Sequence, residues 1–198
     1  MIIYLKKIQK IIKRKIQLVT YYLKYKEQKQ IEEWTGLKCT DIVFDSNIDN
    51  WSPYTTVLNE RITGKKQLIF LIEEEDGEKF GYYLNTEVIG DYDYWQEWME
   101  TDYKSFHFNL QSNGRLPQPM KFEIKDLKFG GYHLYEKSDW DLIQLGDIWL
   151  KKENYKNYSC CYQNEWRFDY HGIEKALCGK TNCWNPFTPK RILVIQMK

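Results

Sequence analysis

Apolar and polar residues alternate along most of the chain with the period of two that is typical of β-strands. The segment 67–72 is apolar at every position after Gln67, as expected for a strand that is buried on both faces. Glycine-containing pairs, such as Asp76-Gly77 and Asn113-Gly114, mark turns. Further strands are expected at 42–44, 79–84, 105–111, 120–124, 132–135, 148–150 and 192–196, and short helices at 54–62 and 170–177.

Many short strands with few helices indicate an α+β fold that is mainly β. We predict an antiparallel two-sheet β-sandwich with peripheral helices and, in front of it, an N-terminal amphipathic basic helix. The length of 198 residues fits one domain with an appendage. We place the helix in residues 1–31 and the sandwich domain in residues 32–198.

The N-terminal pattern is helical, because residues 2–29 contain neither Gly nor Pro and repeat apolar positions every three or four residues. Such a helix would be about 40 Å long. The apolar positions are Leu5, Ile8, Ile12, Ile16, Val19 and Leu23, and basic residues that include Lys6, Lys10, Lys13 and Arg14 occupy much of the remaining surface.

Three interpretations of this helix remain open. It packs on its own domain, it binds a partner or a second copy as a coiled coil, or it lies on an anionic membrane surface. The heptad pattern is imperfect, because Lys15 falls at a core position. Lys6, Lys10, Lys13 and Arg14 are therefore candidate partner-surface residues.

Charge is unevenly distributed along the chain, although its formal total is only +1. Residues 1–30 contain nine Lys or Arg residues and a single acid, Glu27, and so carry a net charge of +8, which leaves −7 for the remainder. Within 71–102, eleven acidic residues face one lysine, Lys79. This bipolar chain lacks the features of a known nucleic-acid-binding module, and we expect no nucleic-acid partner.

The five cysteines and the absence of a signal sequence favour a reduced, cytoplasmic protein, with endomembranes as a peripheral location if the basic helix binds lipid. Zinc ligands could come from Cys160, Cys161, His171, Cys178 and Cys183, which lie within 24 residues. Their Cys-Cys and Cys-x4-Cys spacings differ from the usual pairs. We therefore predict buried thiols, and no metal or cofactor.

The segment 91–102 mixes carboxylates with aromatic rings, and Asp91, Asp93, Trp95 and Trp98 are further candidate partner-surface residues. It fails the calcium-loop pattern, because Trp95 stands where an oxygen ligand is needed. Three interpretations fit: a surface loop that docks its tryptophans, a docking surface for a basic partner, and a glycan-binding face built on Trp95 and Trp98.

No arrangement in the sequence pairs a nucleophile with a base, and the nucleophile-elbow and phosphate-loop patterns are missing. A hydrolase could use Glu73, Glu74 and Glu75 or Asp91 and Asp93, but spacing alone cannot set two carboxylates across a bond. His107 lies between Phe106 and Phe108, so a strand would point its ring to the opposite face. The residues favour a binding domain rather than an enzyme.

Several motifs occur in an order that resembles the TLDc domain. They are Phe44-Asp45-Ser46 with Trp51, the hairpin around Phe80-Gly81, the strand with Phe108 and Leu110, the segment Gly146-Asp147-Ile148, and the closing Gly179, Phe187 and Thr188. The chain departs from the family pattern at Tyr82 and in 140–145, where relatives have a glycine-rich segment that contains histidine.

The resemblance covers about four-fifths of the chain, and it implies a two-sheet sandwich with flanking helices. It further implies a non-catalytic protein-interaction domain, linked to protection against oxidative stress and to regulation of the vacuolar-type proton ATPase. Because 140–145 departs from the pattern, the resemblance does not extend to a pump contact through that segment.

Overall fold

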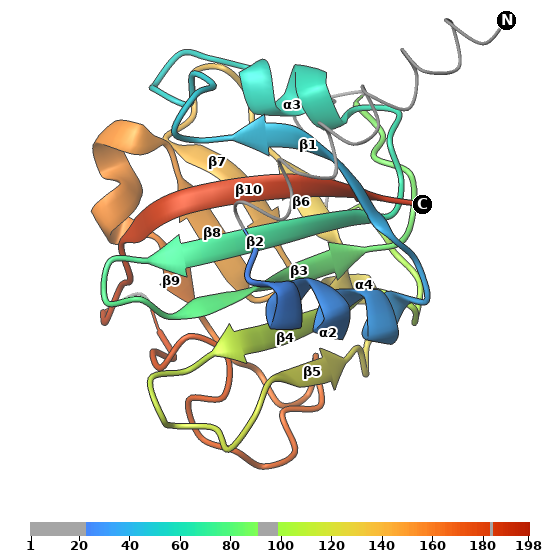
Figure 1. Cartoon of the computed structure of the whole chain (residues 1–198). Coiled ribbons are helices and arrows are strands. Elements are labelled where there is room, and N and C mark those ends of the chain that lie inside the picture. The colour runs from blue at the N-terminus through green and yellow to red at the C-terminus, as the bar shows by residue number, and fades with distance from the viewer. Residues whose placement is uncertain (1–22, 91–98, 183) are drawn as a thin grey trace, which may run out of the picture.

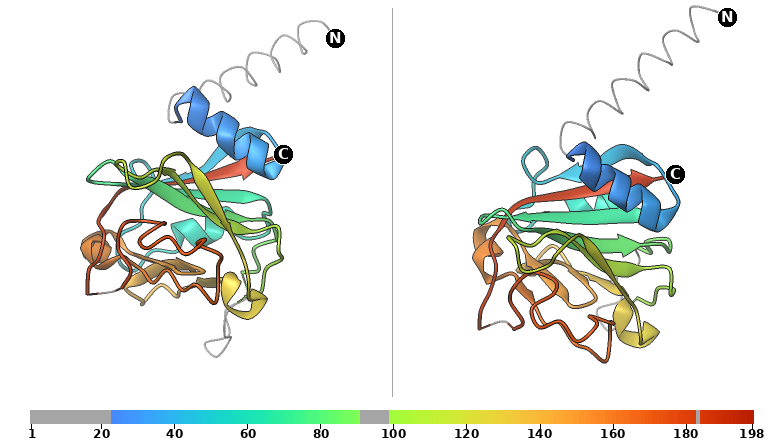
Figure 2. Two further views of the ribbon diagram at one scale, coloured as in Figure 1. Left: turned by 90° about the horizontal axis from the view of Figure 1, so that it is seen from below. Right: turned by 60° about the horizontal axis from the view of Figure 1, so that its bottom comes forward.

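A helix and two antiparallel sheets form three successive layers in the computed structural model, which describes residues 23–90, 99–182 and 184–198 (Figure 1). Figure 2 shows α2 (Tyr25–Thr35) on one side of the larger sheet and the smaller sheet on the other. This arrangement confirms the predicted mainly-β sandwich with two antiparallel sheets.

The larger sheet has six strands in the order β1-β10-β2-β3-β4-β5. Their bounds are β1 (Cys39–Asp45), β10 (Pro189–Met197), β2 (Leu68–Glu74), β3 (Lys79–Leu84), β4 (Phe106–Gln111) and β5 (Met120–Glu123). The smaller sheet consists of β6 (Tyr132–Leu134), β7 (Asp141–Leu145), β8 (Ile148–Lys151) and β9 (Cys160–Cys161). Peripheral helices are α3 (Val57–Ile62), α4 (Leu127–Gly130) and the 3-10 helix η1 (Glu153–Tyr158).

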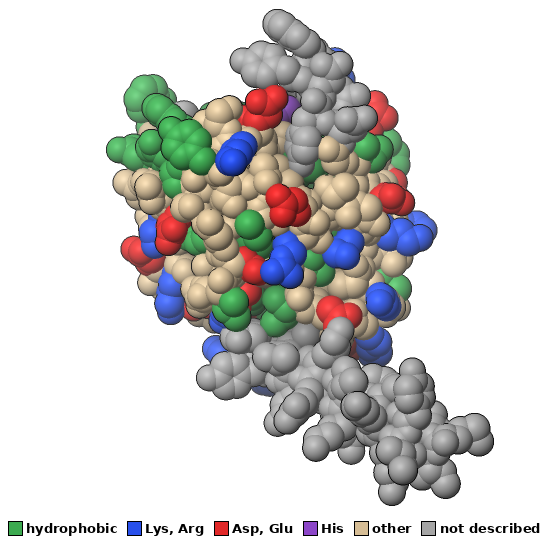
Figure 3. All heavy atoms as spheres, turned by 90° about the horizontal axis from the view of Figure 1, so that it is seen from above, with side chains coloured by type: hydrophobic (Ala, Val, Ile, Leu, Met, Phe, Trp, Pro, Cys, Tyr) green, Lys and Arg blue, Asp and Glu red, His purple; other side chains and the backbone are tan. Residues whose placement is uncertain are grey.

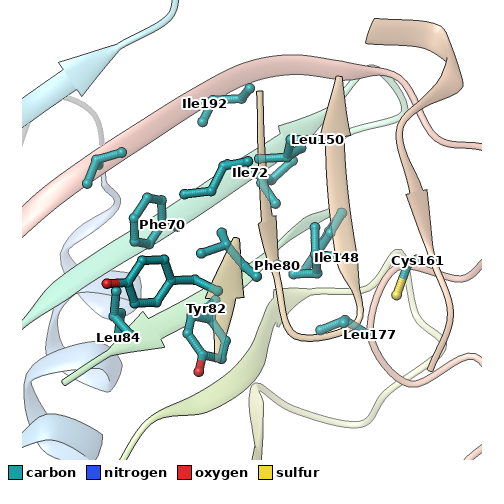
Figure 4. Close-up of a cluster of buried hydrophobic side chains, with 14 of the residues drawn as sticks. Phe70, Ile72, Phe80, Tyr82, Leu84, Ile148, Leu150, Cys161, Leu177 and Ile192 are labelled. Atoms are coloured by element: carbon teal, nitrogen blue, oxygen red, sulfur yellow. The ribbon is translucent and has the colours of Figure 1, made fainter. Parts of the chain in front are cut away.

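The main core lies between the two sheets. Phe70 and Ile72 of β2 and Phe80 of β3 point toward Ile148 and Leu150 of β8, and all five side chains are buried (Figure 4). Because successive strand residues point to opposite faces, Ile69 and Leu71 of β2 face the other way. The central strand is therefore apolar on both faces, as its sequence predicts.

Helix α2 covers the outer face of the six-stranded sheet. Ile31 is fully buried there, and the indole of Trp34 lies 6.2 Å from the rings of both Phe106 and Phe108. At the other end of the helix, the Glu27 carboxylate accepts hydrogen bonds from Lys79 Nζ of β3, at 3.0 and 3.1 Å. This helix is thus an integral layer of the domain, and the boundary predicted between residues 31 and 32 falls inside it.

The prediction of one continuous helix over 2–29 is wrong at residues 23 and 24; residues 1–22 lie outside the described part. Lys24 has φ −58° and ψ 144°, which is not helical, and its backbone N–H donates to the Glu27 carboxylate at 3.0 Å. Glu27 thereby caps a new helix start, while Leu23 is buried at the sheet. The helix ends where Gly36 adopts a left-handed conformation with φ 70°.

Two predictions about the second half of the chain also need correction. Residues 170–177 form turns instead of a helix, because His171, Gly172 and Lys175 all have positive φ. Strand β7 was not predicted, since a bulge between Asp141 and Ile143 breaks its alternation; the short β9 was missed as well. Within the described ranges, no helix is both long enough and apolar enough to cross a bilayer.

At Gly81 of β3, the neighbouring strand β2 approaches too closely to leave room for a side chain. A Cβ at this position would lie 1.9 Å from the Phe70 carbonyl oxygen of the neighbouring strand. A backbone atom cannot move aside without breaking the β2–β3 ladder. The Phe80-Gly81 motif therefore has a steric reason in this fold.

We expect Gly81→Ala to destabilise the domain by about 4 kcal/mol or more, because the clash is with backbone in a central strand. Gly114→Ala is the matched control. Gly114 has φ 86°, and a Cβ there meets nothing within 4 Å, so only about 1 kcal/mol of backbone strain is expected. Urea unfolding measures both; equal losses would contradict this account.

Candidate functional site

The residues that carry the family resemblance mostly build the frame of the sandwich. Phe44, Trp51, Phe80, Ile148 and Phe187 are buried between the sheets. Phe108 and Leu110 belong to the second core beneath α2. None of these side chains offers a polar group to a ligand, apart from the indole of Trp51.

The polar members of the motifs hold strands together. Asp45 accepts from both Nε and Nη2 of Arg191, at 2.9 and 2.5 Å, which ties β1 to β10. The Ser46 hydroxyl accepts from the backbone N–H of Ile192 at 2.9 Å, and the Thr188 carbonyl accepts from that of Glu75 at 3.2 Å. Gly179 adopts φ 74° beside Arg115. Their roles in the described structure are therefore to fix register and turns.

Asp147 is the exception, because it lies at the centre of a buried polar network. Its carboxyl accepts from the backbone N–H and the side-chain Nδ2 of Asn164, at 2.5 and 3.1 Å, and from Arg167 Nη1 at 3.4 Å. The Tyr170 hydroxyl lies 3.0 Å from Asp147 Oδ2 and 3.0 Å from His107 Nδ1. Gly146 has φ 53° and makes the turn that brings Asp147 to this position. A Cβ at Gly146 would collide with Phe168, so the turn requires glycine.

Burial controls the titration of this network. It lowers the pKa of His107 to about 3, against which the hydrogen bond with the Leu145 carbonyl acts only weakly. Burial also raises the pKa of Asp147, although the bonds from Asn164 and the charge of Arg167 oppose the rise. Buried groups with shifted pKa values mark candidate functional positions.

The sequence indicated only part of this network. His107 does point away from Phe106 and Phe108, as predicted, but its partners lie 38 and 63 residues further along the chain. Tyr170 was assigned to a helix, and nothing in its neighbourhood signals contact with Asp147. Pairing across the two sheets depends on topology, which local patterns do not encode.

A groove lies elsewhere, between the C-terminal end of α2 and strands β3 to β5. It encloses about 400 Å³. Trp34, Tyr83, Tyr103 and Phe106 supply aromatic walls, and Thr35, Gln67, Asn85, Lys104, Lys121 and Glu123 supply polar groups. Such a mixed lining suits an amphipathic ligand better than an apolar one.

Accessible groups in this groove are concentrated at its rim. The Tyr103 ring is 64% exposed, whereas Tyr83 and Phe106 are buried beneath. Asn85 is held in place, because its side chain donates to Asp102 at 2.6 Å and accepts from the Tyr83 hydroxyl at 2.9 Å. The rim therefore combines an aromatic face with a preorganised polar floor.

The candidate partner-surface residues predicted from the sequence, Lys6, Lys10, Lys13, Arg14, Asp91, Asp93, Trp95 and Trp98, all lie outside the described residues. The groove as a whole was missed because its residues come from five separate segments, and of its lining only Phe106 belongs to a strand that carries the resemblance. Tyr103 and Lys104 follow directly after the acidic segment 91–102. That segment is the candidate from the sequence that lies closest along the chain to these two groove residues.

Glu73 and Glu74 do not form a catalytic pair in this geometry. They point to opposite faces of β2, and each is bound by a lysine: Glu73 by Lys190 at 3.1 Å and Glu74 by Lys180. Glu75 lies 3.5 Å from Lys156 at the surface. The hydrolase interpretation of this run thus finds no two carboxylates that face a common cleft.

Four cysteines, Cys39, Cys160, Cys161 and Cys178, are buried and form no disulfide with one another, as predicted; Cys183 is not described. In the described ranges, no three His, Cys, Asp or Glu side chains are close enough to hold a metal ion.

Charges are interleaved on the face seen in Figure 3, where Lys and Arg side chains lie among Asp and Glu.

The burial of His107 predicts a pH dependence of stability. Its pKa is near 6.5 in the unfolded chain and about 3 in the folded one, so stability is present above pH 6.5 and is lost as the pH falls. Between pH 6.5 and 5 we expect the free energy of unfolding to fall by roughly 2 kcal/mol from this group.

Urea unfolding across this pH range measures the effect. His107→Gln should lose the part of the slope that His107 contributes, so its free energy of unfolding should fall less over this range than that of the unchanged chain, while His171→Asn, at an exposed position, should keep the slope of the unchanged chain. An unchanged slope in His107→Gln would contradict the assignment.

Neither a scan against protein-family models nor a search of the curated proteins found a match to this chain.

Proposed function

We propose that the chain is a non-catalytic, TLDc-type protein-interaction domain that binds a short segment of a partner protein in the groove beside α2. The resemblance of the motifs makes the vacuolar-type proton ATPase the first partner to test and protection against oxidative stress the cellular role. One observation carries the proposal: the motif residues build the frame, whereas the groove beside α2 combines accessible aromatic and polar side chains.

The chemistry of the groove suits one or two side chains of an extended segment. A typical interface with a folded protein buries about 800 Å² on each partner, so a groove of about 400 Å³ can hold only an anchor. An aromatic or aliphatic side chain fits between Trp34 and Tyr103.

The rim adds a preference for an acidic partner segment. Lys104 is exposed, and its ammonium makes no ion pair with any described residue. Lys121 is shared, because it pairs with Glu123 at 2.9 Å. A carboxylate next to the apolar anchor would therefore meet Lys104 first.

Affinity capture from a lysate, with the full chain as bait, tests this function. We expect pump subunits to be recovered, and the double variant Tyr103→Ala/Lys104→Glu to lose most of that recovery, because it removes the exposed ring and reverses the rim charge. Both positions are exposed, so the fold should persist.

The matched control is Tyr158→Ala/Lys26→Glu, which changes the same residue types at exposed positions away from the groove. It should bind as the unchanged chain does. Failure of a folded, unchanged bait to recover any pump subunit would overturn the choice of partner. Equal recovery by both double variants would overturn the choice of groove.

A second proposal rests on charge: residues 1–30, with a net charge of +8, act as a membrane-surface or coiled-coil adaptor. The structure sharpens its test. Deleting 1–30 would remove the Glu27–Lys79 pair and part of α2, so the deletion must stop at residue 22.

We expect the chain without residues 1–22 to keep its thermal unfolding midpoint but to lose binding to anionic vesicles or to lose self-association. Flotation with phosphatidylserine vesicles and sedimentation measure these two outcomes. Unchanged behaviour in both assays would exclude the adaptor proposal.

A further inference from the structure

A chain of buried hydrogen-bonding groups crosses between the two sheets. It runs from the Leu145 carbonyl oxygen through the His107 imidazole and the Tyr170 hydroxyl to the Asp147 carboxyl, and each of its three links is 3.0 Å long. His107 belongs to β4, whereas Leu145 and Asp147 lie at the β7–β8 turn. The side chains of His107, Tyr170 and Asp147 are fully buried, so these links depend on the protein's own hydrogens.

The number of hydrogens decides which links can form. A carbonyl oxygen only accepts, so His107 Nε2 must carry a hydrogen, and Nδ1 of the neutral ring then carries none. The Tyr170 hydroxyl has a single hydrogen and two neighbours. If Asp147 is ionised, both neighbours are acceptors, and one of the two links contains no hydrogen at all.

One added proton completes the chain. On Asp147 Oδ2, it makes the carboxyl donate to the Tyr170 oxygen, and the Tyr170 hydroxyl donate to His107 Nδ1. On Nδ1, it reverses both links. Every contact then contains one hydrogen, and no buried acceptor faces another.

The surroundings favour the carboxyl as the site of this proton. The His107 ring stacks on Phe168 at 3.9 Å and meets the Tyr82 ring at 5.1 Å, which disfavours a charged imidazolium. The raised pKa of Asp147 and the lowered pKa of His107, both caused first by burial, agree with this placement.

We propose that Asp147, Tyr170 and His107 hold one shared proton, which resides on Asp147 at neutral pH and fastens the two sheets to each other. When the proton is lost, the single hydrogen of Tyr170 can serve either β4 or the β7–β8 turn, but not both. The network is then a pH-sensitive coupling of the sheets. Its contribution to stability is present below the pKa of unfolded aspartic acid and is lost as the pH rises through the folded pKa of Asp147.

Other ionisable groups around the Asp147 carboxyl influence the pH at which the shared proton is lost. Arg167 lies 3.4 Å from Asp147 Oδ1, and its guanidinium is held outward between Phe129 and Trp166, at 4.9 and 4.6 Å from their rings. Burial, the neighbouring Cys178 and the charge of Asp147 raise the pKa of Cys161 in β9, and burial together with Asp147 raises the pKa of Tyr170. Arg167 supplies the counter-charge that lets Asp147 ionise inside the folded protein.

Nuclear magnetic resonance of the full chain, labelled with ¹³C at Asp carboxyls and ¹⁵N in His rings, tests the proposal directly. We expect the Asp147 carboxyl to show the shift of a neutral acid at pH 6.5 and to titrate above the other aspartates. The His107 ring should show a hydrogen on Nε2 alone. An Asp147 carboxyl that is ionised at pH 6.5, or a His107 ring with its hydrogen on Nδ1, would overturn the proposal.

A pair of hydroxyl deletions tests the coupling. Tyr170→Phe removes the relay and should shift the titration midpoint of Asp147 and abolish the pH dependence of amide exchange that β4 and β8 share. Tyr132→Phe, which loses a hydroxyl bonded to Glu87 and Ile89, should leave both unchanged. An unmoved Asp147 titration in folded Tyr170→Phe would overturn the coupling, and if that variant does not fold, the resonances of the unchanged chain decide.

Discussion

Strands β2 and β3 must be shielded from water on both faces, and the rest of the structure follows from this requirement. On β2, Phe70 and Ile72 face the smaller sheet while Ile69 and Leu71 face α2, and exposing either set would cost the free energy of several buried side chains. The smaller sheet alone satisfies only half of the requirement. Helix α2 supplies the second cover, so it belongs to the domain despite its place near the basic N-terminal region.

This double burial explains which parts of the fold can be predicted from the sequence. Runs such as 67–72 and 105–111 predict strands, because the pattern of apolar positions in them directly reflects which side chains are buried. The β7 strand does not, since its bulge buries both Leu142 and Ile143. The apolar pattern of 170–177 suggests a helix, but Asn109 and Gln163 bind its carbonyls at 2.6 and 2.8 Å, which replaces helical hydrogen bonds with side-chain ones.

The candidate sites were less predictable than the frame. Asp147 stands out in the sequence as part of a motif, and His107 by its place between two phenylalanines. Tyr170, the residue that joins them, has no such mark. The groove shows the same limit, because Trp34, Tyr103 and Lys121 approach one another only through the packing of α2 on the sheet.

The acidic turn between β2 and β3 determines how much electrostatic field a charged partner meets as it approaches this end of the molecule. Glu73, Glu74, Glu75 and Glu78 each lie beside a cation, from Lys190, Lys180, Lys156 and Arg115 respectively. Such pairs cancel over a few ångströms, well within the screening length of about 8 Å at physiological ionic strength. A basic partner that approaches this end would meet short-range dipoles instead of a field of one sign, so recognition there would have to be decided by fit at contact.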